Sequence, residues 1–296
     1  MALNLQTFKT RTLTAIIFAA VMITGLLWNH WSFLVLFSIV HFGCWWEYFN
    51  LLEKIHNTNY HRYTRFGFML IGYACMLWFC GPAYEINNYS LKENLSFPVS
   101  IAGFVFLVMG IFQKNNINLK LFGIAVLGLV YISLCWGLMM DLRSMELFYI
   151  PGKHNWYDKG WVIPIIIIGS IWINDTMAYI VGSFIGKTPL SKISPKKTWE
   201  GTIGGIILCI GAFFLITLNQ KEYAPGLIYR NQIIIISAIA SITGTFGDLF
   251  ESKLKRMAGV KDSGSFMPGH GGFLDRFDSL LFAIPAVWVF LYFIVK

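Results

Sequence analysis

Three aspartates near the end of the chain stand out, because each lies in or beside a segment that is otherwise apolar. Asp248 falls inside one apolar stretch, and Asp275 and Asp278 open the next one at positions i and i+3. An unpaired carboxylate in such surroundings is costly. Mg²⁺ in proteins usually takes one or two carboxylates together with substrate phosphates. Although Asp275 or Asp278 alone would be an ordinary helix N-cap, the three together predict a cation site.

Basic residues follow the first of these aspartates at helical spacing. If the helix continues past Asp248, then Ser252, Lys255 and Arg256 share its face. Such a face can hold a cation at one end and a phosphate at the other. The segment 259–264, which begins with Gly259 and contains Lys261, is expected to end this helix.

A glycine-rich turn precedes Asp275. It reads Pro268-Gly269-His270-Gly271-Gly272, with glycine at three of its last four positions. Glycines allow a sharp turn and let backbone N–H groups approach an anion closely. His270 alone would be an ordinary loop residue, but the combination favours a phosphate-binding turn.

A second polar segment covers residues 174–205. Asp175, Tyr179, Gly182 and Gly186 form one stripe on an apolar helix; the glycines favour helix packing, whereas an acid within a span is a functional candidate. Ser194, Lys196, Lys197 and Thr198 then precede a predicted helix start, where phosphate binds readily. Singly, either lysine would fit a cytoplasmic loop.

These two segments resemble the phosphatidate cytidylyltransferase (CDP-diacylglycerol synthase) family. The family signature reads S-x-x-K-R-x4-K-D-x5-P-x-H-G-G-x-x-D-R-x-D, and every fixed position matches between Ser252 and Asp278. Segment 174–205 is similar to the other characteristic loop of the family. The N-terminal half is similar only in being hydrophobic and multi-spanning.

The resemblance implies that CTP and phosphatidic acid react to give CDP-diacylglycerol and pyrophosphate. We expect Mg²⁺, with room for a second cation, at Asp248, Asp275 and Asp278. The residues that we expect in catalysis are Asp248, Asp275, Lys255, Arg256, Arg276 and Lys261. Those that we expect in substrate binding are Lys196, Lys197, Ser194, Thr198, Ser252, His270, Gly271, Gly272 and Asp175. The resemblance also implies a homodimer, and no nucleic-acid partner is expected.

The composition requires a membrane to carry these residues. Hydrophobic residues make up 56% and charged residues 13% of the 296 positions, too few charges for a soluble surface. We therefore predict an all-α, polytopic membrane protein with about nine transmembrane helices. The predicted spans are 13–28, 31–52, 66–82, 95–112, 120–140, 161–184, 203–218, 233–250 and 277–295.

The basic residues also predict the orientation. With a cytoplasmic N-terminus, sixteen Lys and Arg residues lie on the cytoplasmic side and seven on the other, as the positive-inside rule requires. Both polar segments then face the cytoplasm, where nucleotides are found. The predicted location is the inner membrane of a bacterium.

The polar residues divide the chain unevenly. Residues 1–160 are expected to form a transmembrane scaffold and residues 161–296 the catalytic region. Glu47, acidic within an apolar stretch, is the exception; a snorkelling or paired interfacial carboxylate is favoured there over a functional one.

Three other functions remain open. In a transporter, Asp175 and Asp248 would be ion sites, but no internal repeat supports this. An enzyme using CTP on another lipid is a second alternative. A scaffold protein is the third, although it would not require acids within its spans.

Overall fold

The helices of the computed structural model confirm the all-α fold class. The structure describes residues 5–113, 119–145, 147–150, 155–218, 230–266 and 271–295. In that part of the chain, strands are limited to two short antiparallel hairpins, with isolated bridge residues besides. The first hairpin pairs β1 (Glu85–Ile86) with β2 (Tyr89–Ser90), and the second pairs β3 (Leu147–Ile150) with β4 (Asn155–Asp158).

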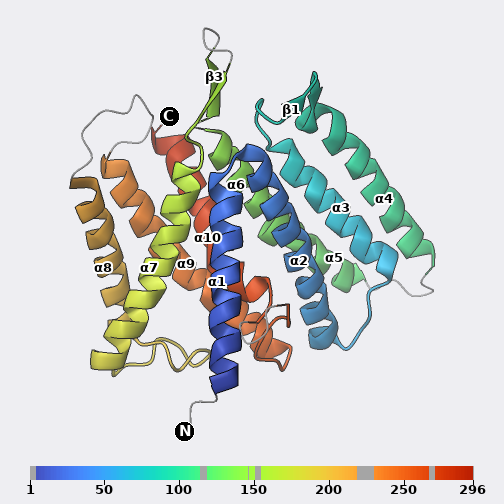
Figure 1. The fold of residues 1–296 in the computed structure, drawn as a ribbon. Helices are drawn as coiled ribbons and strands as arrows, with labels where there is room; N and C mark the ends of the chain where they lie inside the picture. Colours follow the sequence, from blue (N-terminus) through green and yellow to red (C-terminus); the bar gives the residue numbers. More distant parts are fainter. Residues whose placement is uncertain are drawn as a thin grey trace. The chain divides into compact units, whose positions relative to one another are not determined.

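The helices follow one another along the chain (Figure 1). The first four are α1 (Leu5–Leu27), α2 (His30–His56), α3 (Arg62–Trp78) and α4 (Ser96–Phe112), the last preceded by a π-helical turn, Leu91–Leu95. Another π-helical turn, Leu129–Leu134, joins α5 (Leu119–Gly128) to α6 (Cys135–Ser144). The last four are α7 (Val162–Ile185), α8 (Trp199–Leu218), α9 (Arg230–Met257) and α10 (Leu274–Phe290), which ends in a π-helical turn, Leu291–Val295.

Seven helical segments of the described chain are long and apolar enough to cross a membrane. They are His30–His56, Leu91–Phe112, Leu119–Ser144, Val162–Ile185, Trp199–Leu218, Arg230–Met257 and Leu274–Phe293. The first predicted span forms a shorter apolar helix, Thr12–Leu27 within α1, and the third lies on α3, which has 17 residues. A multi-spanning membrane protein is therefore confirmed, while nine crossings and a cytoplasmic N-terminus stay predictions.

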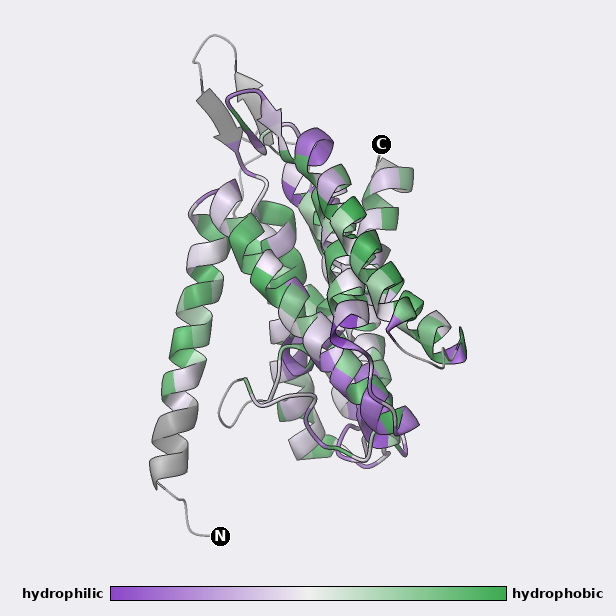
Figure 2. Ribbon diagram, turned by 90° about the vertical axis from the view of Figure 1, so that its right-hand side faces the viewer, coloured by the Kyte–Doolittle hydropathy of each residue, from purple (hydrophilic) through white to green (hydrophobic). Residues whose placement is uncertain are grey.

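The helices consist largely of hydrophobic residues, which are green in Figure 2. Large side chains lie on the outside, with Phe104 62% exposed and Phe112 and Phe184 each 83% exposed. Exposed apolar area of this extent would be unfavourable in water. A bilayer removes that penalty, because its lipid chains are apolar. The helices can also enter it without leaving backbone groups unpaired, since each backbone is hydrogen-bonded internally.

Local sequence signals set the ends of these helices. The side chain of Asn29 accepts a hydrogen bond from the N–H of Ser32 at 2.8 Å, and the hydroxyl of Ser32 accepts one from the N–H of Asn29 at 3.1 Å. This capping box starts α2. The helix ends at Asn57, which adopts the left-handed conformation with φ of 49°.

The chain forms two units by its internal contacts. Unit 1 combines Met1–Asp158 with Leu254–Phe277, and unit 2 combines Lys159–Lys253 with Asp278–Lys296. The predicted catalytic region, 161–296, has segments in both units, and its boundary stays a prediction.

Aromatic side chains from α2, α3 and α6 fill the core of unit 1. Trp45 is fully buried, stacks on Phe68 and donates a hydrogen bond from its indole nitrogen to the hydroxyl of Ser133 at 2.8 Å. The same hydroxyl lies 3.0 Å from a ring nitrogen of His41. Three polar side chains of this core, His41, Trp45 and Ser133, thereby meet one another, which offsets part of the cost of burying them.

Glycines allow close helix pairs in both units. In unit 1, where α3 and α4 lie side by side (Figure 1), Gly67 faces Leu107 and Gly103 faces Ile71. In unit 2, a Cβ at Gly201 or Gly205 of α8 would stand within 2.8 Å of a carbonyl oxygen of α7. Small residues of this kind let membrane helices approach closely.

Replacing Gly103 with alanine should lower the midpoint of thermal unfolding in detergent. The new Cβ would stand 2.8 Å from the backbone nitrogen of Ile71 and 2.9 Å from the carbonyl oxygen of Gly67. Overpacking of this kind costs about 1–3 kcal/mol. The control is Gly123→Ala in α5, where nothing lies within 4 Å and alanine is the better helix former. Equal destabilisation by both changes would contradict the close α3–α4 contact.

Candidate functional site

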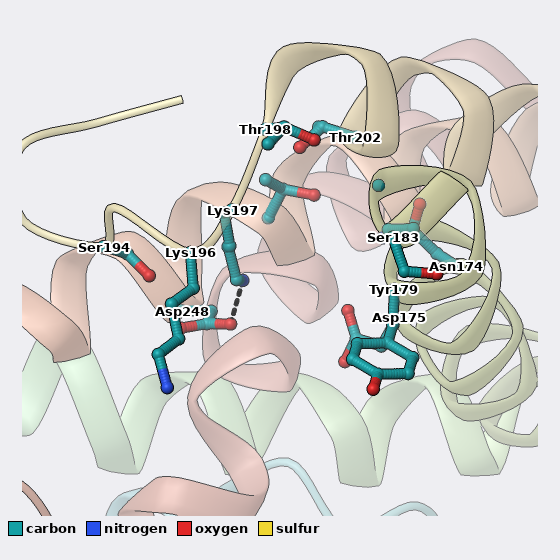
Figure 3. A pocket seen from close by; sticks show the side chains of 13 residues that line it. Asn174, Asp175, Tyr179, Ser183, Ser194, Lys196, Lys197, Thr198, Thr202 and Asp248 are labelled. Carbon is teal, nitrogen blue, oxygen red and sulfur yellow. Dashed lines mark hydrogen bonds and ion pairs between the residues drawn. The ribbon is translucent and has the colours of Figure 1, made fainter. Parts of the chain in front are cut away.

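A cavity of about 490 Å³ in unit 2 collects many of the predicted site residues (Figure 3). Its walls come from α7, the segment before α8, the start of α8, and α9. Six predicted residues line it: Asp175, Ser194, Lys196, Lys197, Thr198 and Asp248. Positions distant in sequence are therefore neighbours around one space.

The acid of α9 in this cavity is paired. The ammonium group of Lys197 forms an ion pair with one carboxylate oxygen of Asp248, the contact drawn as a dashed line in Figure 3. The hydroxyl of Ser252 donates a hydrogen bond to the other oxygen at 3.2 Å. Since the side chains of Lys197 and Asp248 are 30% and 25% exposed, a ligand in the cavity can reach the pair.

The start of α8 holds the lysine segment in position. The hydroxyl of Thr198 accepts a hydrogen bond from the N–H of Gly201 at 3.1 Å and so caps the helix, which begins at Trp199. Upstream, the N–H of Leu190 donates to the carbonyl oxygen of Lys197 at 2.7 Å. The positive end of the α8 dipole and two ammonium groups therefore belong to the same short segment.

Asp175 lies on α7 at the wall of the same cavity, where its side chain is exposed. The glycines of this helix serve helix packing, as predicted from the sequence. Gly182 faces the hydroxyl of Thr198 and the Cα of Gly201. Asp175 and Asp248 are thus two acids of one cavity.

A second cluster, in unit 1, is built around Asp275 in the first turn of α10. The ammonium group of Lys255 lies 2.6 Å from one carboxylate oxygen. The other oxygen accepts hydrogen bonds from the N–H of Ser263 at 2.9 Å, from its hydroxyl at 3.0 Å and from the N–H of Gly272 at 2.7 Å. Gly271 turns the chain here with φ of 87°. The predicted turn thus directs an N–H group at a carboxylate of the chain itself.

Comparison with known proteins identifies the family. The family model described as "Cytidylyltransferase family" matches residues 9–294. The chain belongs to this family. It is 34% identical to a phosphatidate cytidylyltransferase of Bacillus subtilis over 76% of this chain and 77% of the relative. It is 30% identical to one of Staphylococcus saprophyticus over 96% of this chain and 98% of the relative.

Membership confirms the resemblance seen in the sequence and extends it to the N-terminal half. The B. subtilis and S. saprophyticus relatives carry the name of a transferase of phospholipid synthesis. The cytidylyltransferase described here is therefore a nucleotidyltransferase enzyme and a membrane protein.

The other predicted residues of the cytidylyltransferase have different surroundings. Arg256, Lys261 and Arg276 are exposed. Asp278 is buried, and one of its carboxylate oxygens accepts the N–H of Ser279 at 2.6 Å. His270 lies outside the described residues.

Glu47 is the residue whose place the sequence interpretation missed. It is 4% exposed, so the snorkelling half of the interpretation is wrong, whereas the carboxylate does have partners, which are hydrogen-bond donors. Its carboxylate accepts hydrogen bonds from the N–H groups of Phe273 and Leu274, each at 2.9 Å, and from the hydroxyl of Ser263 at 2.7 Å. The sequence did contain a signal for this contact. A buried carboxylate needs several hydrogen-bond donors, and the glycine-rich turn was expected to offer N–H groups.

The cavity of unit 2 fits a hard cation in its donor chemistry. It offers the carboxylates of Asp175 and Asp248 with the hydroxyls of Thr198, Thr202 and Thr245, all oxygen donors, and the ammonium of Lys197 already holds a positive charge against Asp248. Among the described residues, no three His, Cys, Asp or Glu side chains form a metal-binding group. A cation here would depend on phosphate oxygens for further ligands, which suits Mg²⁺. The three-aspartate cation site stays a prediction.

Replacing Gly271 with alanine should destabilise the turn more than the same change at Gly259. Both glycines have positive φ, of 87° and 68°, which costs an L-residue about 1–2 kcal/mol. Only at Gly271 would the new Cβ also overlap the carboxylate of Asp275, since Gly259 has open space around it. Thermal unfolding and hydrogen exchange at Ser263 and Gly272 measure the difference. Equal effects of the two changes would mean that Asp275 does not lie against the turn.

Proposed function

We propose that this cytidylyltransferase joins CTP to phosphatidic acid, giving CDP-diacylglycerol and pyrophosphate. The observation that carries the proposal is the cavity of unit 2, where Lys196, Lys197 and the capped start of α8 gather donors for phosphate beside two carboxylates. The names of the B. subtilis and S. saprophyticus relatives support the choice of substrates.

The reaction is a substitution at phosphorus. A phosphate oxygen of phosphatidic acid attacks the α-phosphorus of CTP and forms a new P–O bond. The bond from that phosphorus to the oxygen bridging to the β-phosphate breaks, and pyrophosphate leaves with the electron pair. Both reactants are anions, so positioning and charge neutralisation supply most of the catalysis.

The residues of unit 2 would neutralise the nucleotide. In the proposal, Lys196 and Lys197 bind phosphate oxygens, and Ser194, Thr198 and Ser252 donate hydrogen bonds. A cation held by Asp248, with Asp175 lining the same cavity, would neutralise charge on the phosphates as a Lewis acid. Because Lys197 now pairs with Asp248, we propose that this lysine turns to the phosphates when the substrates bind.

The residues of unit 1 would act on the same reaction. Lys255, held by Asp275 at 2.6 Å, would bind a phosphate oxygen, and exposed Arg256, Lys261 and Arg276 would attract the anionic substrates. Gly271 and Gly272 would give the backbone close access. Asp275 of this unit and Asp278 of unit 2 would complete the proposed cation ligands.

The setting of the reaction is also part of the proposal. The active site would face the cytoplasm at the inner membrane of a bacterium, and the lipid would enter sideways with its acyl chains in the bilayer. The chain would work as a homodimer. The excess of Lys and Arg on the predicted cytoplasmic side supports the orientation.

The assay that tests this function uses purified protein, labelled CTP, phosphatidic acid and Mg²⁺. Labelled lipid should form, and Asp248→Asn or Asp275→Asn should lower its rate by about 100-fold, as when a charge-stabilising group is lost. Glu85→Gln, on the exposed β1 hairpin, is the control and should keep full activity. Activity above about one-tenth in either Asn variant would argue against a cation at that aspartate. If no lipid is labelled, substrate flux in vesicles would favour the transporter alternative.

Lys197 should matter to CTP use far more than Lys192 of the same loop. Lys197 lines the cavity, whereas Lys192 is exposed and does not line it. We expect Lys197→Met to lower kcat/KM for CTP at least tenfold, roughly the effect of removing one preorganised charge. Lys192→Met should change it less than about twofold. Steady-state kinetics at varied CTP measures both, and matching losses would indicate general attraction by surface charge instead of a phosphate contact.

A further inference from the structure

We propose that Glu47 is a positioning residue, which holds the glycine-rich turn so that Asp275 meets Lys255. The inference rests on the function proposed above, because it gives Glu47 a part in the same reaction. It rests on contacts within unit 1 alone.

The hydrogen bonds of Glu47 connect α2 to two separate parts of the signature segment. One carboxylate oxygen accepts the N–H of Phe273 at 2.9 Å. The other accepts the N–H of Leu274 at 2.9 Å and the hydroxyl of Ser263 at 2.7 Å. One side chain therefore binds both the start of α10 and the loop that follows α9.

Burial makes this arrangement obligatory for the carboxylate. Glu47 and Ser263 are each 4% exposed, and Leu274 is fully buried. Among the described residues, no lysine, arginine or histidine forms an ion pair with Glu47. Its charge is compensated by backbone N–H groups at the positive end of the α10 dipole and by one hydroxyl. Displacement of the turn would leave the charge buried without donors, which is costly.

The same loop and turn residues hold Asp275 from the other side. The N–H of Ser263 lies 2.9 Å, and the N–H of Gly272 2.7 Å, from one carboxylate oxygen of Asp275. The Ser263 hydroxyl is 2.7 Å from Glu47 and 3.0 Å from Asp275, and its single proton can serve one of them at a time. Glu47 thus fixes the donors that orient Asp275 toward Lys255.

Three glycines, in the loop, in the turn and on α2, fit this role. A Cβ at Gly264 or Gly272 would overlap the carboxylate of Glu47, and one at Gly43, a turn earlier on α2, would overlap the ring of Phe273. Gly264, Gly272 and Phe273 therefore lie directly against α2 around this side chain. These glycines are needed for close approach, whereas the positive φ of Gly271 serves the change of direction.

Glu47→Gln tests the proposal because it keeps the size of the side chain. Gln has one acceptor oxygen and one NH₂ donor, so in either orientation an NH₂ group faces a backbone N–H of Phe273 or Leu274. We expect kcat to fall at least tenfold, the loss typical when a residue that hydrogen-bonds to and orients a metal-binding side chain is replaced. KM for phosphatidic acid should change little, since Glu47 itself touches no substrate.

The control is Glu53→Gln on the same helix. Glu53 forms an ion pair with Arg65 at 2.7 Å and accepts the N–H of Tyr60 at 2.7 Å. It lines a pocket with Ser263, but neither of its two partners belongs to the loop that follows α9 or to the turn. This change should lower the thermal midpoint and leave kcat within about twofold. If Glu47 only stabilised the fold, both variants would behave like Glu53→Gln, and the proposal would be overturned.

Two further measurements separate positioning from other causes. Ser263→Ala should lower kcat as well, and the double change with Glu47→Gln should cost less than the product of the single effects, because both act through Asp275. Hydrogen exchange of segments 262–264 and 272–276 should quicken in Glu47→Gln and not in Glu53→Gln. This exchange needs no activity, so it tests the contact even if wild-type protein makes no CDP-diacylglycerol; unchanged exchange overturns the proposal by itself.

Discussion

The cost of placing a carboxylate inside an apolar helix bundle governs the rest of this structure. Lipid and packed side chains offer few donors, so each acid must find its own partners. Asp248 is paired with Lys197, and Asp275 with Lys255. Glu47 instead takes backbone N–H groups at the start of α10. Each partner comes from a loop or a helix end, and the constraint thereby ties the polar loops to the helices.

Local patterns in the sequence were enough to predict the helices. The apolar stretches lie on α1 to α10, and α8 begins where Thr198 caps it. The hairpin of β1 and β2 was not predicted, although Asn87 and Asn88 both adopt positive φ, of 50° and 64°, and such an Asn pair is a recognisable two-residue hairpin turn. Here the signal was local, but it lies in a polar connection between two predicted spans, where no element was expected.

The pairings within the site could be predicted only in part. Residue types and spacing indicated that Lys197, Asp248, Lys255 and Asp275 belong to sites, because each lies within a dense polar motif. Their partners were not predictable, since each contact joins segments that only the tertiary fold brings together. Glu47 shows this most clearly, because its donors lie more than 200 residues away in sequence, at separations of 216 to 227. An isolated acid carries no pattern that identifies its donors.

The ion pairs also explain how the proposed site for two anions can remain folded without its substrates. The two lysines and the helix N-terminus beside the cavity of unit 2 would repel one another if nothing balanced them. Asp248 balances Lys197 in unit 2, and Asp275 balances Lys255 in unit 1. In the proposed reaction, substrate phosphates would replace the carboxylates as partners of the lysines, and a cation would replace the lysines as partner of the carboxylates. The internal pairs would then hold both kinds of charge in position before the substrates bind, as preorganised electrostatics requires of an enzyme.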